Sequence, residues 1–212
     1  MNPQGLPMPP QTRHDYLRRL DPEYYRGRAM VHWSLTVAQR HTGWLDARAH
    51  AIWREALLHT LARYRLAAPV YCLMPDHAHV LLVGLAVESD QRLALSFLRR
   101  HTVAMFETMR GTWQKQGYDN VLRESERGRD GFATVAHYVA ENPVRAKLVA
   151  KAAEWKYSGS LIAGWPDLDW RREDFWERWW KIFAECFGDE RGNAVSCGGS
   201  GSVSATSARP NM

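Results

Sequence analysis

The stretch VYCLMPDHAHVLLV, residues 70–83, decides the fold that this sequence predicts. Val70–Met74 is a short apolar strand, and His77–Val83 is a second one. Pro75 and Asp76 between them form a turn, so the stretch predicts a tight β-hairpin. Both arms are apolar on both faces, which is typical of strands that are covered on both sides. We therefore expect this hairpin to lie in the centre of a sheet.

The segments around the hairpin supply the other elements of an α+β domain. Ala29–Val37 alternates between apolar and polar residues, as a strand does, and Asp46 is a suitable N-cap for a helix to about Arg65. After the hairpin we expect a helix from Asp90 to about Met109, a weak strand at Val121–Ser125 and a helix from Asp130 to Asn142 that Pro143 ends. This order predicts a ferredoxin-like sandwich, an antiparallel sheet with helices on one face.

Composition divides the chain into four parts. Residues 1–27 are rich in Pro, Arg and Tyr and lack periodicity, so we expect a leader before a domain at residues 28–160. Residues 161–187 contain five tryptophans and predict a C-terminal helical extension, which either covers the domain or forms a platform for stacking bases. Residues 188–212 are dominated by Gly, Ser, Ala and Asn and predict a disordered tail.

The charge of the chain indicates a nucleic-acid partner. Its 212 residues hold 28 Lys and Arg against 23 Asp and Glu, and residues 1–160 contain 22 of the bases but 15 of the acids. Twenty-three of the bases are Arg, whose planar guanidinium pairs with phosphate and stacks on bases. A solvated Arg-rich surface has the same composition and is the alternative.

Several classes of protein are excluded or disfavoured. The sequence shows no secretory signal and no membrane-spanning stretch, so we expect a cytoplasmic protein. Three cysteines without metal-ligand spacing indicate neither a disulfide framework nor a cysteine zinc site. No phosphate-binding glycine loop or GxSxG motif is present, and Cys72 in an apolar strand is expected to be a small hydrophobic residue.

His77 and His79 are the first candidates for chemistry. They lie two residues apart on a predicted strand, so both imidazoles leave the same face of the sheet and can reach one metal ion. In an apolar hairpin, two adjacent imidazoles need partners for their polar nitrogens. A metal ion is one possible partner, and hydrogen bonds within a folded core are the other.

Tyr138 and Asn142 are the second pair of candidates. They lie one turn apart on the third predicted helix, whose neighbouring apolar side, formed by Phe132, Val135 and Val139, should dock on the sheet. If that helix packs beside the hairpin, Asn142 can supply a third metal ligand and Tyr138 a nucleophile for phosphorus. Alternatively, Tyr138 is a half-buried packing residue and Asn142 is an ordinary helix terminus.

Four motifs resemble those of one family of transposases. YCLMPDHAHVLLV at Tyr71–Val83 resembles the YxxMPNHxHLLL signature of the single-tyrosine HUH transposases. YVAENPVRAKLV at Tyr138–Val149 resembles the YIxxNPVRAGLV signature of one branch, the REP-associated tyrosine transposases. WQKQGYDNVLR from Trp113 and EWKYSGS from Glu154 are similar to further motifs of that branch. The motifs occur in the family's order, and the resemblance covers residues 25–160.

The resemblance implies an RRM-like sandwich that acts as a DNA strand transferase. In the family, both motif histidines and a polar residue four positions after the tyrosine hold one divalent cation, Mg²⁺ or Mn²⁺, which maps onto His77, His79 and Asn142. Tyr138 would attack a phosphodiester of single-stranded DNA and form a 5′-phosphotyrosine link. The expected partner is single-stranded DNA with hairpin-forming repeats, bound by a monomer or a homodimer. A sequence-specific single-stranded DNA-binding protein and a metal-dependent phosphodiesterase are the alternatives.

The sequence also predicts which arginines contact phosphate and where the chain departs from the family. The leading candidates for phosphate contacts are Arg99, Arg100, Arg123 and Arg145. Asp76 stands where the family signature usually has Asn, Asn120 follows Asp119 where the branch often has His, and Lys147 replaces a common Gly. These departures leave the predicted catalytic and metal-binding residues intact and concern substrate recognition.

Overall fold

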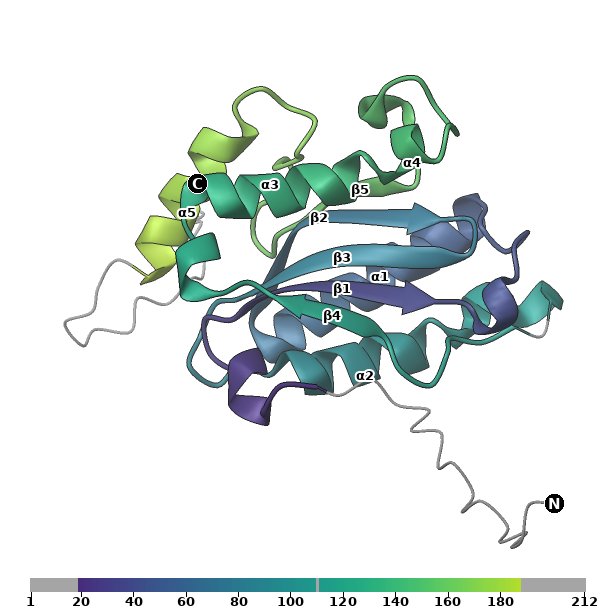
Figure 1. The fold of residues 1–212 in the computed structure, drawn as a ribbon, viewed down its shortest axis with the longest axis horizontal. Coiled ribbons are helices and arrows are strands. Elements are labelled where there is room, and N and C mark those ends of the chain that lie inside the picture. Colours follow the sequence, from purple (N-terminus) through teal and green to yellow (C-terminus); the bar gives the residue numbers. More distant parts are fainter. Residues whose placement is uncertain (1–18, 110, 188–212) are drawn as a thin grey trace, which may run out of the picture.

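The computed structural model describes residues 19–109 and 111–187 (Figure 1). In chain order, its strands and helices are β1 (Met30–Thr36), α1 (Ala47–Tyr64), β2 (Leu66–Met74), β3 (His77–Gly84), α2 (Gln91–His101), β4 (Tyr118–Val121), α3 (Arg129–Ala140), α4 (Asn142–Arg145), β5 (Ser158–Leu161) and α5 (Phe175–Phe187). Short 3₁₀ turns lie at Pro22–Tyr25, Ala38–Arg40, Val103–Met109, Glu124–Glu126 and Ala152–Glu154. None of the helices in the described ranges is long and apolar enough to cross a bilayer.

The strands form one antiparallel sheet in the order β4-β1-β3-β2-β5. The first four strands have the order of a ferredoxin-like sandwich, so the predicted fold class is confirmed. The hairpin β2–β3 lies in the centre of the sheet, as its two apolar faces predict. The Val37 N–H donates to the Asp76 carbonyl at 2.9 Å and ties the hairpin turn to the end of β1.

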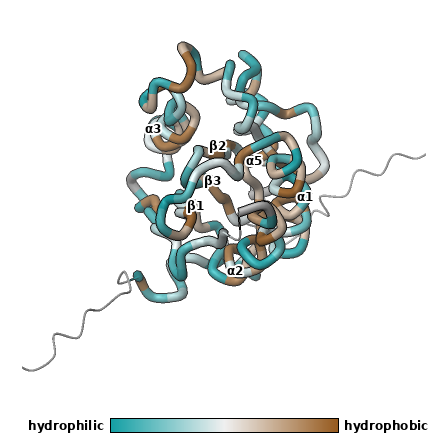
Figure 2. Tube along the Cα trace, turned by 90° about the vertical axis from the view of Figure 1, so that its right-hand side faces the viewer, coloured by the Kyte–Doolittle hydropathy of each residue, from teal (hydrophilic) through white to brown (hydrophobic). Residues whose placement is uncertain are grey.

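Helices cover both faces of the sheet (Figure 2). Trp33 and Val80 belong to the core beneath α1 and α2, whereas Leu81 belongs to a second core beneath α3 and α5. Because side chains alternate along a strand, His32 and Leu81 share the α3 side of the sheet. The expectation that helices lie on one face therefore holds for α1 and α2, and α3 adds a layer on the other.

The helices begin where the sequence predicts, but their ends differ. Asp46 accepts a hydrogen bond from the Ala49 N–H at 2.7 Å and caps α1, as expected. The predicted helix 90–109 is interrupted at Thr102, whose hydroxyl donates to the Leu98 carbonyl and accepts from the Trp113 indole N–H at 2.8 Å. The chain then continues as a 3₁₀ turn. This interruption depends on a contact between segments 11 residues apart, which periodicity does not reveal.

Two more boundaries differ from expectation near the third helix. The weak strand was predicted at 121–125, but the observed strand β4 spans Tyr118–Val121. It begins earlier because three polar residues before Val121 also pair with β1 at the edge of the sheet. Pro143 was expected to end the helix, and α3 does end at Ala140. The chain then turns into the short helix α4 with Pro143 in its first turn, where proline is tolerated.

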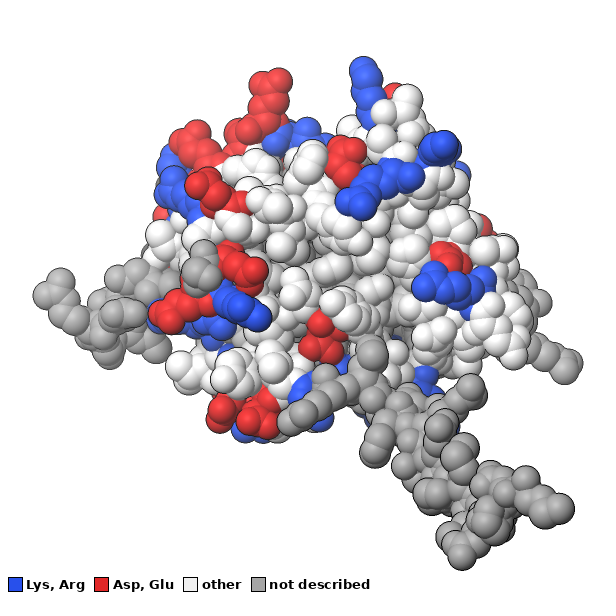
Figure 3. Space-filling model, viewed as in Figure 1, with Lys and Arg blue, Asp and Glu red and all other residues white. Residues whose placement is uncertain are grey.

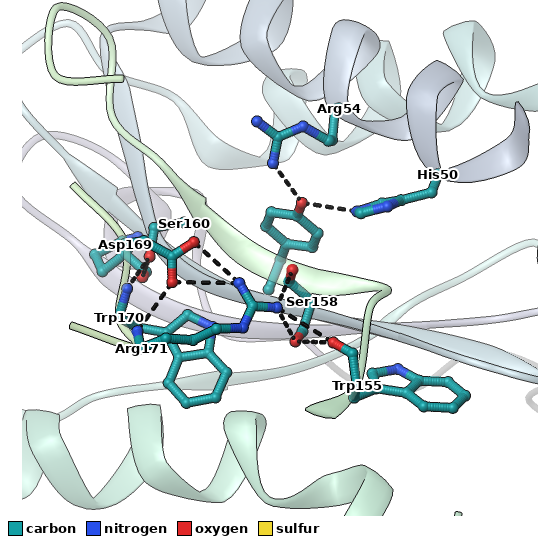
Figure 4. A network of polar contacts seen from close by, with 10 residues as sticks. His50, Arg54, Trp155, Ser158, Ser160, Asp169, Trp170 and Arg171 are labelled. Carbon is teal, nitrogen blue, oxygen red and sulfur yellow. Dashed lines mark hydrogen bonds and ion pairs between the residues drawn. The ribbon is translucent and has the colours of Figure 1, made fainter. Parts of the chain in front are cut away.

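Strand β5 was not predicted, and an arginine of the Trp-rich segment holds it in place (Figure 4). Arg171 donates to the Ser158 carbonyl at 2.6 Å and to the Trp155 carbonyl at 3.2 Å, and it forms an ion pair with Asp169 at 3.0 Å. The Ser160 hydroxyl donates to the Pro69 carbonyl at 2.7 Å. The segment SGSL has little apolar pattern of its own, so these tertiary contacts define the strand.

Parts of the predicted leader and extension are built into the cores. Tyr25 is fully buried, and its hydroxyl donates to Asp119 at 2.6 Å, so the end of the predicted leader packs against the sheet. In the extension, Phe175 and Trp179 are fully buried, and the Trp179 ring stacks on Phe132 of α3 at 6.0 Å. These two residues cover the domain. The predicted tail, residues 188–212, and residues 1–18 lie outside the described residues.

Candidate active site

His77 and His79 bring their imidazoles together on the α3 side of the sheet. Both lie on β3, and their Nε2 atoms are 3.0 Å apart with ring planes at 88°. His79 is buried, and His77 is half-buried at the end of the strand. Two nitrogens bound to one ion at about 2.1 Å and at right angles lie about 3 Å apart, so this separation suits a shared cation.

Each of these two histidines has a hydrogen-bond partner at its other ring nitrogen. The Nδ1 of His77 lies 2.5 Å from an oxygen of Asp76, and the Nδ1 of His79 lies 3.0 Å from the Nε2 of His32. If both Nδ1 atoms carry the proton and donate it, both Nε2 atoms keep a lone pair toward the same point. Outer partners that fix the tautomer in this way are typical of metal-binding histidines.

His32 is the residue of the site that the sequence analysis missed. It lies on β1 and is buried, and its burial lowers its pKa to about 4, so the ring is neutral and its Nε2 can accept a hydrogen bond from His79. Burial, and then the neighbouring His32 and His77, lower the pKa of His79 to about 3. A polar residue between the apolar Val31 and Trp33 was the available signal, since strand alternation places it on the face of His79.

Asp76, where the family signature usually has Asn, supports His77 with a full negative charge. Burial alone would raise the pKa of Asp76, but the hydrogen bonds from His77 and Arg40 outweigh it and lower that pKa. The Arg40 guanidinium lies 2.8 Å from the second carboxylate oxygen. Asp76 is therefore ionised and can accept a hydrogen bond from the His77 Nδ1–H. Asp at this position thus provides the same kind of acceptor oxygen as the side-chain carbonyl of the Asn in the family signature.

Tyr138 extends from α3 to the histidines. Its ring centre lies 5.7 Å from that of His32 and 6.0 Å from that of His79, both in edge-on geometry. Tyr138 is 39% exposed, so part of the residue faces solvent. Phe132 and Val139 on the neighbouring side of α3 are fully buried and fix the position of the helix over β2 and β3.

Asn142 lies one turn beyond Tyr138 and caps the end of α3. Its amide nitrogen donates to the Tyr138 carbonyl at 2.8 Å. This hydrogen bond leaves the amide oxygen as the atom that can bind an ion. Among the described residues, no three His, Cys, Asp or Glu side chains converge on a common ion. The side-chain hydrogen bonds of Asn142 go to the Tyr138 and Val139 carbonyls and not to either histidine.

The four predicted phosphate-binding arginines lie in different places. Arg145 is next to Tyr138, with its guanidinium 5.0 Å from the centre of the ring. Arg123 follows β4 on the rim of a hollow at the sheet edge. Arg99 and Arg100 are on α2, which covers the opposite face of the sheet, and Arg99 donates to the carbonyls of residues 114 and 115. Of these four arginines, only Arg145 contacts Tyr138 in the described structure.

Comparison with known proteins gives a likeness of fold. No protein-family model and no curated protein matches the chain. The fold is similar to the solved structure of a REP-associated tyrosine transposase bound to a REP hairpin, with a TM-score of 0.56 and 16% identity, over 68% of this chain and 81% of that one.

Two further solved structures are weaker matches. A protein of Deinococcus radiodurans R1 described as a transposase has a TM-score of 0.39 and 17% identity, over 53% of this chain and 88% of that one. A bacterial tRNA(His) guanylyltransferase-like protein in complex with GTP has a TM-score of 0.36 and 12% identity, over 58% and 70%. This chain has the fold of the REP-associated tyrosine transposases, as its motifs predicted.

Proposed function

We propose that this protein is a transposase-type enzyme that cleaves and rejoins single-stranded DNA through Tyr138. The observation that carries the proposal is the contact of the Tyr138 ring with a histidine pair whose Nε2 atoms are 3.0 Å apart. A tyrosine at the edge of a two-histidine site places a nucleophile next to residues that can bind a divalent cation. The fold likeness and the four sequence motifs support the same activity.

We assign separate roles in cation binding to the residues of the site. His77, His79 and the amide oxygen of Asn142 would hold the cation, while Asp76 and His32 keep the two imidazoles in the required tautomer. When bound, Mg²⁺ or Mn²⁺ would polarise the scissile phosphate and offset the charge of the leaving oxygen. Imidazole ligands suit Mn²⁺ better than Mg²⁺.

Tyr138 would carry the covalent step. Its phenolic oxygen forms a bond to phosphorus and loses its proton to solvent, and the bond from phosphorus to the 3′ oxygen breaks. The products are a 5′-phosphotyrosine and a 3′-hydroxyl group, which takes a proton from water. The phosphotyrosine bond conserves the energy of the phosphodiester, so attack by another 3′-hydroxyl can rejoin the strand. Arg145 lies beside the ring, where its guanidinium can pair with the phosphate.

We propose hairpin-forming repeats as the DNA target, because the neighbour in fold was solved with a REP hairpin. The test is incubation of the protein with single-stranded oligonucleotides copied from the DNA that flanks its gene, in the presence of Mn²⁺ or Mg²⁺. A denaturing gel should show cleavage, and mass spectrometry should place the DNA adduct on the peptide that contains Tyr138.

Tyr138→Phe separates the proposal from its alternatives. The variant keeps the ring and its packing, so stability should change by about 1 kcal/mol or less while the adduct disappears and DNA binding remains. Undiminished cleavage by Tyr138→Phe would indicate a phosphodiesterase that uses water. Binding without any cleavage by the unmodified protein would indicate a DNA-binding protein.

A further inference from the structure

No helix of the described residues covers one half of the sheet face that carries the histidines. On this side, α3 packs on β2 and β3, whereas β1 and β4 extend beyond it (Figure 1). The register places Tyr118 of β4 opposite Ser34 of β1, and Ser34 opposite His79 of β3. Directly paired residues in antiparallel strands share a face, so these side chains form one row across the sheet.

Tyr118 is the exposed aromatic residue of this row. Its side chain is 57% exposed, and no hydrogen bond or ring contact among the described residues involves it. The next residue, Asp119, points to the other face, where it accepts from the Tyr25 hydroxyl at 2.6 Å and pairs with Arg19. One face of β4 is therefore built into the core, and the other presents a large ring to solvent.

The position of Tyr118 relates it to the proposed active site. Two strand spacings of about 4.8 Å separate β4 from β3, so the Tyr118 backbone lies about 10 Å from that of His79. A DNA strand with its scissile phosphate at the histidines would bring a nearby nucleotide over β4. This distance is too great for a contact with the reacting atoms, and Tyr118 is therefore not a catalytic residue.

The surroundings of Tyr118 suit nucleic acid. Asn120, two residues along β4 on the same face, is exposed, and it lines a hollow of about 610 Å³ together with Tyr24, Arg123 and Arg127. The middle of this view is largely uncharged apart from one acidic group near β4; Lys and Arg lie toward the right and upper rims, and both signs of charge gather at the left (Figure 3). An aromatic ring beside an amide and flanking guanidinium groups is the usual composition of a single-strand binding surface.

We infer that Tyr118 stacks against a base of the bound single strand, close to the cleaved phosphate, and thereby positions the strand over β1 and β4. The inference rests on the proposed function for the location of the DNA. Tyr118 supplies a flat apolar face for any base, so it contributes affinity and register rather than recognition of one sequence. Asn120 beside it can form hydrogen bonds to a base edge.

Fluorescent oligonucleotides test this inference. A series of single strands that carry 2-aminopurine at successive positions is bound to full-length Tyr138→Phe protein, which should leave the DNA intact. Stacking should quench the fluorescence at one position near the scissile phosphate. Adding Tyr118→Ala should abolish that quenching and weaken binding about 5- to 150-fold, whereas adding Tyr118→Phe should preserve both.

Two control variants test whether the effects are specific to the Tyr118 ring. Leu93 on α2 is also 57% exposed but lies on the helical layer over the opposite face, so Leu93→Ala should leave quenching and affinity unchanged. Tyr118→Thr retains a residue that favours strands but lacks a ring, and it should behave like Tyr118→Ala with a normal thermal unfolding transition.

Each result has a defined meaning. Unchanged quenching and affinity in folded Tyr118→Thr would overturn the inference, and equal losses in Tyr118→Phe and Tyr118→Ala would replace stacking with a role of the hydroxyl group. Failure of the proposed function has a different signature, which is the absence of an adduct on Tyr138 in the unmodified protein. Position-specific quenching that depends on the Tyr118 ring would support the stacking role in either case.

Discussion

The two faces of the sheet use the same strands for different purposes, and the adjacent residues His32 and Trp33 show the difference. Trp33 points to α1 and α2, where it is buried in an apolar core and its indole N–H donates to Gln91 at 3.1 Å. His32 points to α3 and contacts His79 and Tyr138. Both faces bury an apolar core, but the α3 face also holds the imidazoles of His32 and His79 beside Tyr138.

We therefore expect stability and activity to depend on different residues, stability on the apolar cores and activity on the histidines. Removing a large side chain from the α1 face leaves a cavity, which costs free energy of unfolding. Removing a histidine from the α3 face removes a polar group that contributes little to apolar burial. Substitutions in an apolar core and substitutions of the histidines should therefore affect different measurements.

The largest effect is expected from the histidine pair. His77→Ala or His79→Ala should reduce DNA cleavage at least about 1000-fold, because the cation loses one of its two imidazole ligands. The thermal unfolding transition should remain cooperative and close to that of the unmodified protein. Cleavage is measured on denaturing gels, with His59→Ala as the control because His59 is exposed on α1. A lost transition in both variants would assign the histidines to the core instead.

The next effect concerns the packed face. Trp53 of α1 is fully buried, and Trp53→Ala should lower the free energy of unfolding by about 3–5 kcal/mol. Urea denaturation measures this change. Leu58 on the same helix is 45% exposed, so Leu58→Ala should stay within about 0.5 kcal/mol. A Trp53→Ala protein as stable as Leu58→Ala would show that this core does not carry the stability of the domain.

A smaller effect should follow from loss of the His32 ring. His32→Ala removes the partner of the His79 Nδ1, so the affinity for Mn²⁺ should fall about 10- to 100-fold. Titration calorimetry measures that affinity in the absence of DNA. Ser34→Ala, two residues along the same face of β1, is the matched control and should bind Mn²⁺ normally. Equal affinity in His32→Ala and Ser34→Ala would contradict the orienting role of His32.

The smallest effect is a pH dependence on the α1 face. The His50 Nε2 lies 2.9 Å from the Tyr71 hydroxyl, which also accepts from Arg54 at 2.9 Å (Figure 4), so the tyrosine proton is donated to a neutral His50. Burial, and then the charges of Arg54 and Arg171, lower the pKa of His50 to about 4. The unfolded chain takes up a proton near pH 6.5, which the folded protein does not.

Stability should therefore be complete above pH 6.5 and fall as the pH decreases toward 4. The His50 ring is partly exposed, which reduces its contribution to about 1 kcal/mol. Urea denaturation of the unmodified protein and of His50→Gln between pH 7 and pH 4 measures it, since His50→Gln should lose less stability over this range. Parallel curves for the two proteins would assign the pH dependence to other groups, such as His32.

Much of the fold follows from local pattern. The alternation in β1, the apolar hairpin and the cap at Asp46 specify the sandwich, and the spacing of His77 and His79 places both on one face. Strand β5 could not be predicted, because SGSL has no period and is held by Arg171 from a later segment. The placement of Arg99 on the opposite side of the sheet from the histidines could not be predicted, because a helix sequence does not reveal which face of the sheet the helix covers.

The two-residue connection at Pro75 and Asp76 has a consequence for how this site can change over time. Its second residue is held twice, by the Val37 N–H on the Asp76 carbonyl and by Arg40 on the Asp76 carboxylate. An insertion of one residue that shifted β3 by one position would move its histidines into the Trp33 core. Loop lengths elsewhere can drift among descendants of this gene, whereas this turn should keep its length wherever activity is inherited.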